Sequence, residues 1–143
     1  WNFTNIEGVG FTGPMFPPLT LRSGVWQHVA VVHDDTARTT SIYVDGEMIV
    51  QQTDIGAPVP SGFAETWLGN TFGFKITGDI KDFRIWEEAR TPSELNIDIT
   101  GDEPNLITYF PLDRVKGLSF TDDTDSGDFN GEMRGIIWNT EDN

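Results

Sequence analysis

The stretch that decides the fold is residues 25–50, which read VWQHVAVVHDDTARTTSIYVDGEMIV. Residues 25–33 are rich in β-branched side chains and are long enough for one strand. Apolar side chains occupy both faces of that strand, which predicts a central strand covered on each side. Residues 41–44 and 47–50 then flank Asp45-Gly46, a pair that tolerates the positive φ angles of a type I′ turn. The stretch therefore predicts a strand followed by a β-hairpin.

Outward from this stretch, short β-rich runs alternate with turn residues. Further strands are predicted at residues 66–69, 79–86, 106–112 and 135–138, and a loop at residues 57–62 (APVPSG). One helix is predicted near residues 92–98, because Thr91-Pro92-Ser93-Glu94 offers an N-cap, a proline at the first helical position and a capping-box glutamate. The fold class is therefore all-β, as a two-sheet sandwich with one short helix.

Composition excludes several classes of partner and site. The chain has 143 residues, with 9 Lys+Arg against 23 Asp+Glu, and a formal net charge of −14. That length predicts one domain, and that charge argues against nucleic acid, because carboxylates repel phosphate. No apolar run approaches the roughly 20 residues of a membrane span, so no membrane insertion is expected. The absence of cysteine excludes disulfides and thiolate metal sites.

The order of the motifs resembles a known family. Residues 26–34 (WQHVAVVHD) followed by 42–46 (IYVDG) resemble the core of laminin-G-like domains, which are jelly-roll modules of the concanavalin A-like lectin/glucanase superfamily. Residues 78–86 (GDIKDFRIW) resemble that family's glycine-led penultimate strand, and residues 89–95 (ARTPSEL) its helix. The segment from Thr100 to Trp138 is similar to the one that trails this helix in bacterial multi-repeat surface proteins. The matches together run from about Trp26 to Trp138.

The resemblance implies a concanavalin A-like, laminin G-like jelly-roll sandwich spanning residues 1–143 as a single domain. Residues 100–143 form a trailing segment that either completes this sandwich or belongs to the next one. The family's opening strands have no counterpart here, since the sequence begins at Trp1 in what resembles mid-domain. We therefore expect the sheet to be completed by further polypeptide of the same chain or by neighbouring subunits. Residues 1–143 alone are expected to aggregate, to be molten or to form an obligate oligomer.

Glycoside hydrolysis is the enzymatic activity to consider for this chain, because the superfamily that it resembles includes glucanases. Such enzymes place two carboxylates beside the scissile bond. Asp79 and Asp82 are the nearest pair, but side chains three apart on a strand point to opposite faces. His28 and His33, five apart, also face opposite sides of their strand, and a hydrogen-bonded core histidine is the simpler interpretation of His28. The sequence therefore predicts no catalytic residues.

Two kinds of binding site remain open. Asp122, Asp125 and Asp128, with Asp123 between them, offer the hard oxygen ligands that Ca²⁺ prefers, and related lectin-like modules commonly bind calcium. The alternative is a solvated acidic loop, because the spacing does not fit an EF-hand. A sugar site would need an exposed aromatic ring. The candidates near loops are Trp1, Phe11, Phe16, Trp67, Phe72 and Phe74, whereas Trp67, Phe83, Trp86 and Trp138 are also explained as core.

The function expected from this reasoning is a non-catalytic binding or adhesion module, secreted or at the cell surface, that recognises a glycan or a surface protein. A second hypothesis is a structural subunit of a surface filament or layer, completed by strands from its neighbours. A third is an accessory domain of a carbohydrate-active enzyme whose active site lies elsewhere. The ligand itself is not specified by any motif.

Overall fold

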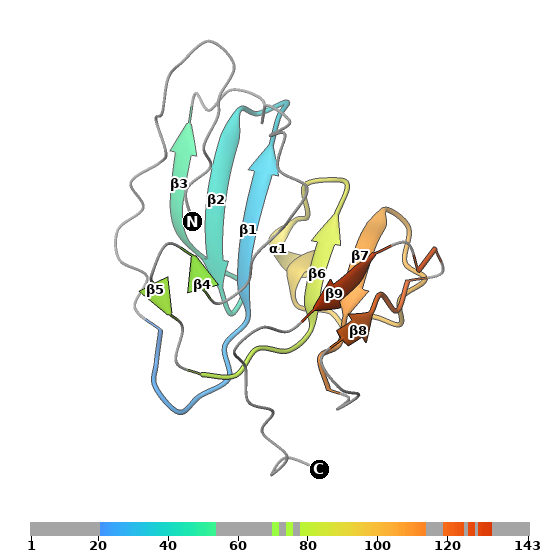
Figure 1. The fold of residues 1–143 in the computed structure, drawn as a ribbon. Helices are drawn as coiled ribbons and strands as arrows, with labels where there is room; N and C mark the ends of the chain where they lie inside the picture. Colours follow the sequence, from blue (N-terminus) through green and yellow to red (C-terminus); the bar gives the residue numbers. More distant parts are fainter. Residues whose placement is uncertain are drawn as a thin grey trace. The chain divides into compact units, whose positions relative to one another are not determined.

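The computed structural model describes residues 21–53, 70–71, 74–75, 78–113, 119–124, 126–127 and 129–132 (Figure 1). Within these residues the chain is mostly β-strand with one short helix, and every strand pairing is antiparallel. The predicted all-β class is confirmed. The chain divides into two compact units, residues 1–65 with 88–97 and residues 66–87 with 98–143.

The first unit contains a sheet of β1 (Val29–Asp34), β2 (Thr39–Val44) and β3 (Glu47–Thr53), in that order. The predicted hairpin is confirmed, because β2 and β3 pair across Asp45 and Gly46, whose φ angles are 52° and 81°. Both angles are positive, as a type I′ turn requires, and only residues such as Asp, Asn and Gly adopt them at low cost.

The central strand of the described sheet is β2, not the strand predicted for residues 25–33. Strand β1 begins only at Val29, and among the described residues it pairs with β2 alone. Ser41 and Ile42 point to opposite faces, yet both are buried, at 3% and 4% exposure. Strand β2 can be buried although it carries polar side chains, because its hydroxyl groups have hydrogen-bond partners. Gln51 Nε2 donates to Ser41 Oγ at 3.0 Å, and Thr40 Oγ1 lies 2.9 Å from His33 Nδ1.

The link between β1 and β2 is a second turn that the sequence pattern did not reveal. Asp34 Oδ1 accepts a hydrogen bond from the Ala37 amide at 2.8 Å, and Arg38 adopts a positive φ of 54°. An aspartate that bonds the backbone a few residues ahead favours a turn without needing glycine. No glycine or proline marks this turn, which explains why the sequence pattern did not predict it.

Helix α1 (Pro92–Leu95) starts where it was predicted but ends earlier than residue 98. The Thr91 amide donates to Glu94 Oε2 at 2.8 Å, and the Glu94 amide donates to the Thr91 carbonyl at 2.9 Å. The first bond is the glutamate half of a capping box, whereas the second is a backbone bond that closes the first turn. The helix stops at Asn96, whose φ and ψ of −116° and 55° are not helical. Isoleucines at 97 and 99 are poor helix formers, so nothing local extends the turn.

The second unit contains three two-stranded sheets. They are β4 (Asn70–Thr71) with β5 (Phe74–Lys75), β6 (Phe83–Trp86) with β7 (Leu106–Phe110), and β8 (Ser119–Thr121) with β9 (Asn130–Glu132). The Phe83 and Phe110 rings stack with centroids 6.2 Å apart, and the Phe110 and Phe120 rings meet edge to face at 4.8 Å. Phe83 therefore packs against the Phe110 ring, but it is only half-buried, whereas Phe110 is buried at 8% exposure.

Two strands of this unit are shorter than predicted. The strand predicted at 79–86 begins at Phe83, because Asp82 adopts a positive φ of 53°. The strand predicted at 106–112 ends at Phe110, since Pro111 has no N–H for the ladder and Leu112 has a φ of 57°. The predictions for residues 57–62, 66–69 and 135–138 lie outside the described residues. No helix among the described residues is long and apolar enough to cross a membrane.

Candidate functional site

A pocket of about 370 Å³ lies on one face of the β1–β2–β3 sheet. Alternate side chains of a strand share a face, which brings side chains from three strands to its floor. They are Val32 and Asp34 from β1, Thr39, Ser41 and Tyr43 from β2, and Gln51 from β3. Residues 89–92, which lead into α1, also line it. We call this feature the sheet pocket.

The sheet pocket carries polar groups with unused hydrogen-bonding capacity. Tyr43 is only 8% exposed, and its hydroxyl makes no hydrogen bond to any residue that the structure describes. Asp34 uses Oδ1 for the Ala37 amide, while Oδ2 makes no hydrogen bond within the described part of the chain. Gln51 donates from Nε2 to Ser41, which leaves its carbonyl oxygen to face other donors. The pocket therefore presents one carboxylate oxygen, one phenol and one amide.

Arg90 lines the same pocket but its charge is balanced nearby. Its Nη1 lies 3.4 Å from Glu88 Oε1 and 3.8 Å from Glu94 Oε1, and its side chain is only 13% exposed. The Thr91 hydroxyl and amide bind Glu94, and with Arg90 they lower the pKa of that carboxyl below its usual range. Both glutamates lie close enough to the guanidinium to offset its charge. The lining of the pocket therefore does not carry a net positive charge.

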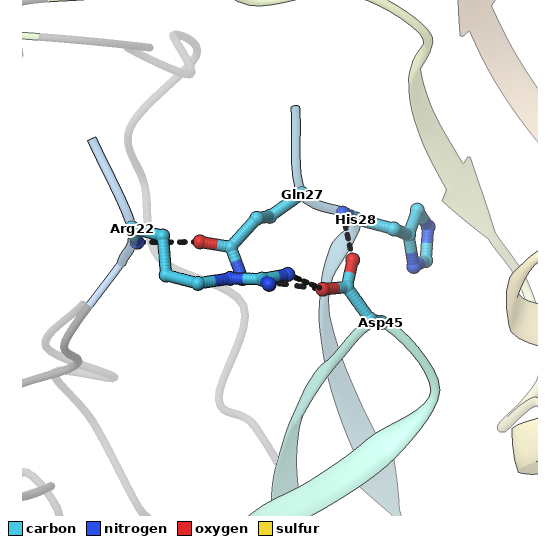
Figure 2. A network of polar contacts seen from close by, with 4 residues as sticks. All are labelled: Arg22, Gln27, His28 and Asp45. Atoms are coloured by element: carbon cyan, nitrogen blue, oxygen red, sulfur yellow. Dashed lines mark hydrogen bonds and ion pairs between the residues drawn. The ribbon is translucent and has the colours of Figure 1, made fainter. Parts of the chain in front are cut away.

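A separate polar network surrounds Asp45 at the β2–β3 turn (Figure 2). Its carboxylate accepts bonds from the His28 amide at 2.9 Å, from Gln27 Nε2 at 3.2 Å and from Arg22 Nη2 at 3.0 Å. The His28 amide contributes most to lowering the pKa of Asp45, followed by Gln27. In return the Asp45 amide donates to the His28 carbonyl at 2.8 Å. The network fixes the segment before β1 onto the hairpin, which is a structural role.

The acidic segment predicted to bind calcium is described only in part. Asp122 is 6% exposed, and its Oδ1 accepts the Tyr109 amide at 2.9 Å and the Thr124 amide at 3.1 Å. Burial opposes ionisation of Asp122, but these amides outweigh it and lower its pKa. Asp125 and Asp128 lie outside the described residues. Among the residues that are described, no group of three acidic or histidine side chains could hold a metal ion. Asp122 therefore joins β7 to the turn after β8.

The two carboxylates considered for hydrolysis are not placed on a strand at all. Asp79 is exposed and, like Asp82, precedes β6. Asp82 Oδ1 accepts a hydrogen bond from the Tyr109 hydroxyl at 3.1 Å. Burial, together with this neighbouring carboxylate, raises the pKa of Tyr109 to about 12. The hydroxyl is thus neutral at physiological pH and holds Asp82 beside β7.

The aromatic candidates for sugar stacking fall on residues whose side chains the structure does not describe. Sequence reasoning also missed the residues of the sheet pocket. The signal that was available is the alternation of Thr39, Ser41 and Tyr43, which places polar groups on one face of β2. That alternation alone does not reveal the second wall, because residues 89–92 are far away in the sequence.

Comparisons with known proteins identify the family. A laminin G family model described as the concanavalin A-like lectin/glucanases superfamily matches residues 10–96. A solved structure of a candidate carbohydrate-binding protein from Bacteroides ovatus is 29% identical, with a TM-score of 0.65 over 90% of this chain and 40% of its own. An S-layer domain-containing protein from Clostridium thermocellum is 25% identical, with a TM-score of 0.48 over 54% of this chain and 40% of its own. No curated protein matches the chain significantly.

This chain therefore spans less than half the length of either solved structure. The family match, by contrast, covers more than half of the 143 residues and includes β1, β2, β3 and α1. The jelly-roll fold implied by the motifs is the fold of that superfamily, and the described antiparallel strands agree with it. The chain belongs to the concanavalin A-like lectin/glucanases superfamily.

Proposed function

We propose that this chain is a non-catalytic carbohydrate-binding domain of a secreted or cell-surface protein. The observation that supports it best is the likeness to the candidate carbohydrate-binding protein from Bacteroides ovatus, which extends over 90% of this chain. The superfamily description covers lectins and glucanases alike, so carbohydrate is the ligand class common to both. The acidic composition, with a net charge of −14, favours solubility, as a secreted or surface-exposed domain requires.

The absence of catalysis is proposed from the chemistry of the available carboxylates. A glycosidase needs one carboxyl as general acid and a second as base or nucleophile on the other side of the scissile bond. Asp82 is bound to the Tyr109 hydroxyl and helps to connect two strands, which is a structural use. Asp79 stands on an exposed segment that precedes β6 and is not part of a strand. Neither arrangement favours hydrolysis.

Calcium remains a proposal that rests on Asp125 and Asp128. Asp122 Oδ1 accepts two backbone amides, which leaves only the buried Oδ2, without a hydrogen-bond partner among the described residues, to contact a metal ion. We propose that any calcium in this segment is bound by Asp125 and Asp128, with Asp122 Oδ2 and backbone carbonyls as further ligands. Titration with CaCl₂ should then raise the melting temperature, and the D125N/D128N variant should lose that rise. An equal rise in the variant would place the calcium elsewhere.

The proposed function is tested on the purified chain with a glycan array and with insoluble polysaccharides, each with CaCl₂ and with EDTA. We expect retention of at least one carbohydrate and no release of reducing ends during long incubation. Release that disappears in D79N or D82N would identify an enzyme. Failure to retain any carbohydrate, together with assembly into filaments or sheets, would favour the structural-subunit hypothesis instead.

A further inference from the structure

We propose that the sheet pocket, lined by Asp34, Tyr43 and Gln51 and by residues 89–92, binds a single neutral sugar ring. The inference rests on the proposed carbohydrate-binding function and names the site and the class of sugar.

The size of the pocket suits one ring. Its volume of about 370 Å³ lies near the lower end of the range for small-molecule sites, about 300–1,000 Å³. Val32, Ala37 and Pro92 supply short apolar surfaces in the same lining. Such surfaces can pack against the C–H groups of a sugar without covering its hydroxyls.

The polar floor offers hydrogen bonds that the described protein leaves unmade. The Tyr43 side chain is more than nine-tenths buried, and its hydroxyl lacks a partner among the described residues. Tyr43 lines the pocket, so its hydroxyl can exchange water for a hydroxyl of a ligand, and a hydrogen bond gained in this way makes a modest net contribution to binding. Tyr43 arises from β2 and is held by the strands on either side, which fixes the position of its hydroxyl.

Asp34 and Gln51 complement this phenol. Asp34 Oδ2 can accept from a sugar hydroxyl while Oδ1 remains on the Ala37 amide. The side-chain carbonyl oxygen of Gln51 is a second acceptor, since Gln51 Nε2 already donates to Ser41 Oγ. Acceptors outnumber donors on this floor, and that pattern matches a ligand rich in hydroxyl groups.

The charge of the pocket favours a neutral sugar over an acidic one. Asp34 is a carboxylate, and the guanidinium of Arg90 is offset by Glu88 and Glu94 at 3.4 and 3.8 Å. Asp34 and Arg90 are the charged residues of the lining, and Arg90 is already close to two glutamates outside it, so an anionic sugar would find repulsion from Asp34 and no unbalanced cation. A neutral hexose meets no such penalty.

The test uses two variants that change one group each. Y43F removes only the hydroxyl. D34N keeps an oxygen for the Ala37 amide and replaces the other carboxylate oxygen with a donor. The matched controls are Y109F, which removes a hydroxyl bonded to Asp82 in the second unit, and D35N, which removes an exposed neighbouring charge outside the pocket lining.

Each protein is titrated with methyl glycosides of glucose, galactose and mannose and with glucuronic acid, and is followed by amide NMR and by thermal unfolding. A neutral glycoside should shift the Ser41 amide and the Gln51 side-chain amide, whereas glucuronic acid should not. Y43F should weaken binding about three- to tenfold and D34N at least about tenfold. Y109F and D35N should bind as the wild type does.

The outcomes separate the pocket from the function. The chain can be retained by polysaccharides while its pocket signals do not shift, or while Y43F and D34N bind unchanged. Either result contradicts the proposed pocket but is compatible with the proposed function. Tighter binding of glucuronic acid than of the neutral glycosides overturns the neutral-sugar assignment. A chain that binds no carbohydrate in either assay overturns the proposed function, and the pocket with it.

Discussion

At the scale of single residues, positive φ angles mark the positions where the choice of side chain matters most. Asp45 and Gly46 turn the hairpin, and Gly101 sits in the turn before β7 with a φ of 105°. A Cβ at Gly101 would lie 2.2 Å from the Asp123 carbonyl oxygen. The backbone itself approaches too closely there for any side chain.

Gly101→Ala should therefore destabilise the second unit by about 3 kcal/mol, through the unfavourable φ and the clash together. The measurement is the urea midpoint of unfolding. Gly127→Ala is the control, because Gly127 also has a positive φ, 56°, but open space around the added Cβ. The control should cost about 1 kcal/mol. Equal losses in the two variants would contradict the clash.

Asp45→Asn tests the network around the hairpin turn. Asparagine tolerates the same φ and still accepts from the His28 amide, so the change removes mainly the charge. The folded pKa of Asp45 lies below its usual value of 3.8. Its contribution to stability is thus present above that value and is lost as the pH falls through the lower folded pKa.

The variant should accordingly melt below the wild type near about pH 7, and the difference should shrink at about pH 2. Circular dichroism melts across this range provide the measurement. Arg22→Ala serves as a control for the ion pair, which is exposed and contributes little. If the difference in melting temperature between Asp45→Asn and the wild type grew toward low pH, the result would contradict this prediction.

At the scale of elements, the short helix and the strands depend on different forces. Helix α1 is too short to be stable alone, since isolated helices below about 12–15 residues are marginal in water. Its capping box and the burial of Leu95, at 7% exposure, hold it in place. The strands are held by antiparallel partners and, in the second unit, by the contacts of Phe83, Phe110 and Phe120.

Thr91→Ala should lower the free energy of unfolding by about 1 kcal/mol, as for the loss of an N-cap hydroxyl. That hydroxyl lies 2.5 Å from Glu94 Oε2 and 3.1 Å from Ser93 Oγ. Thr91→Ser keeps the hydroxyl and should stay within a few tenths of a kcal/mol of the wild type. An unchanged urea midpoint in the alanine variant would mean that the cap does not contribute.

At the scale of the whole molecule, the net charge of −14 is the dominant feature. Like charges repel in the compact state more than in the unfolded chain. Residues 79–143 carry 16 of the 23 carboxylates, so the repulsion is concentrated in the C-terminal half. Four described carboxyls, Asp45, Glu94, Glu103 and Asp122, have lowered pKa values because hydrogen-bond donors hold them ionised.

Raising NaCl from about 10 mM to about 150 mM shortens the screening length from about 30 Å to about 8 Å. The melting temperature should rise, because screening relieves the repulsion. Tetramethylammonium chloride at the same ionic strength should act equally if the effect is screening and not sodium binding. A fall in melting temperature with salt would show that ion pairs such as Arg22–Asp45 outweigh the repulsion.

The sequence by itself determined the features that depend on neighbouring residues. The Asp45-Gly46 turn and the Thr91–Glu94 capping box were both predicted, because φ preference and capping act within a few residues. The all-β class and the family followed from the same short motifs. The turn at Asp34 was missed only because it uses a side-chain bond in place of glycine.

Two features depend on the tertiary structure: which strand is buried at the centre of the sheet, and which distant residues come together in the sheet pocket. Strand β2 is buried despite its hydroxyls, because Gln51 and His33 satisfy them from neighbouring strands. The sheet pocket joins Tyr43 to residues 89–92, which are separated by more than forty positions in the sequence. Burial and proximity depend on which distant segments pair, and the local preferences of a strand do not encode that choice.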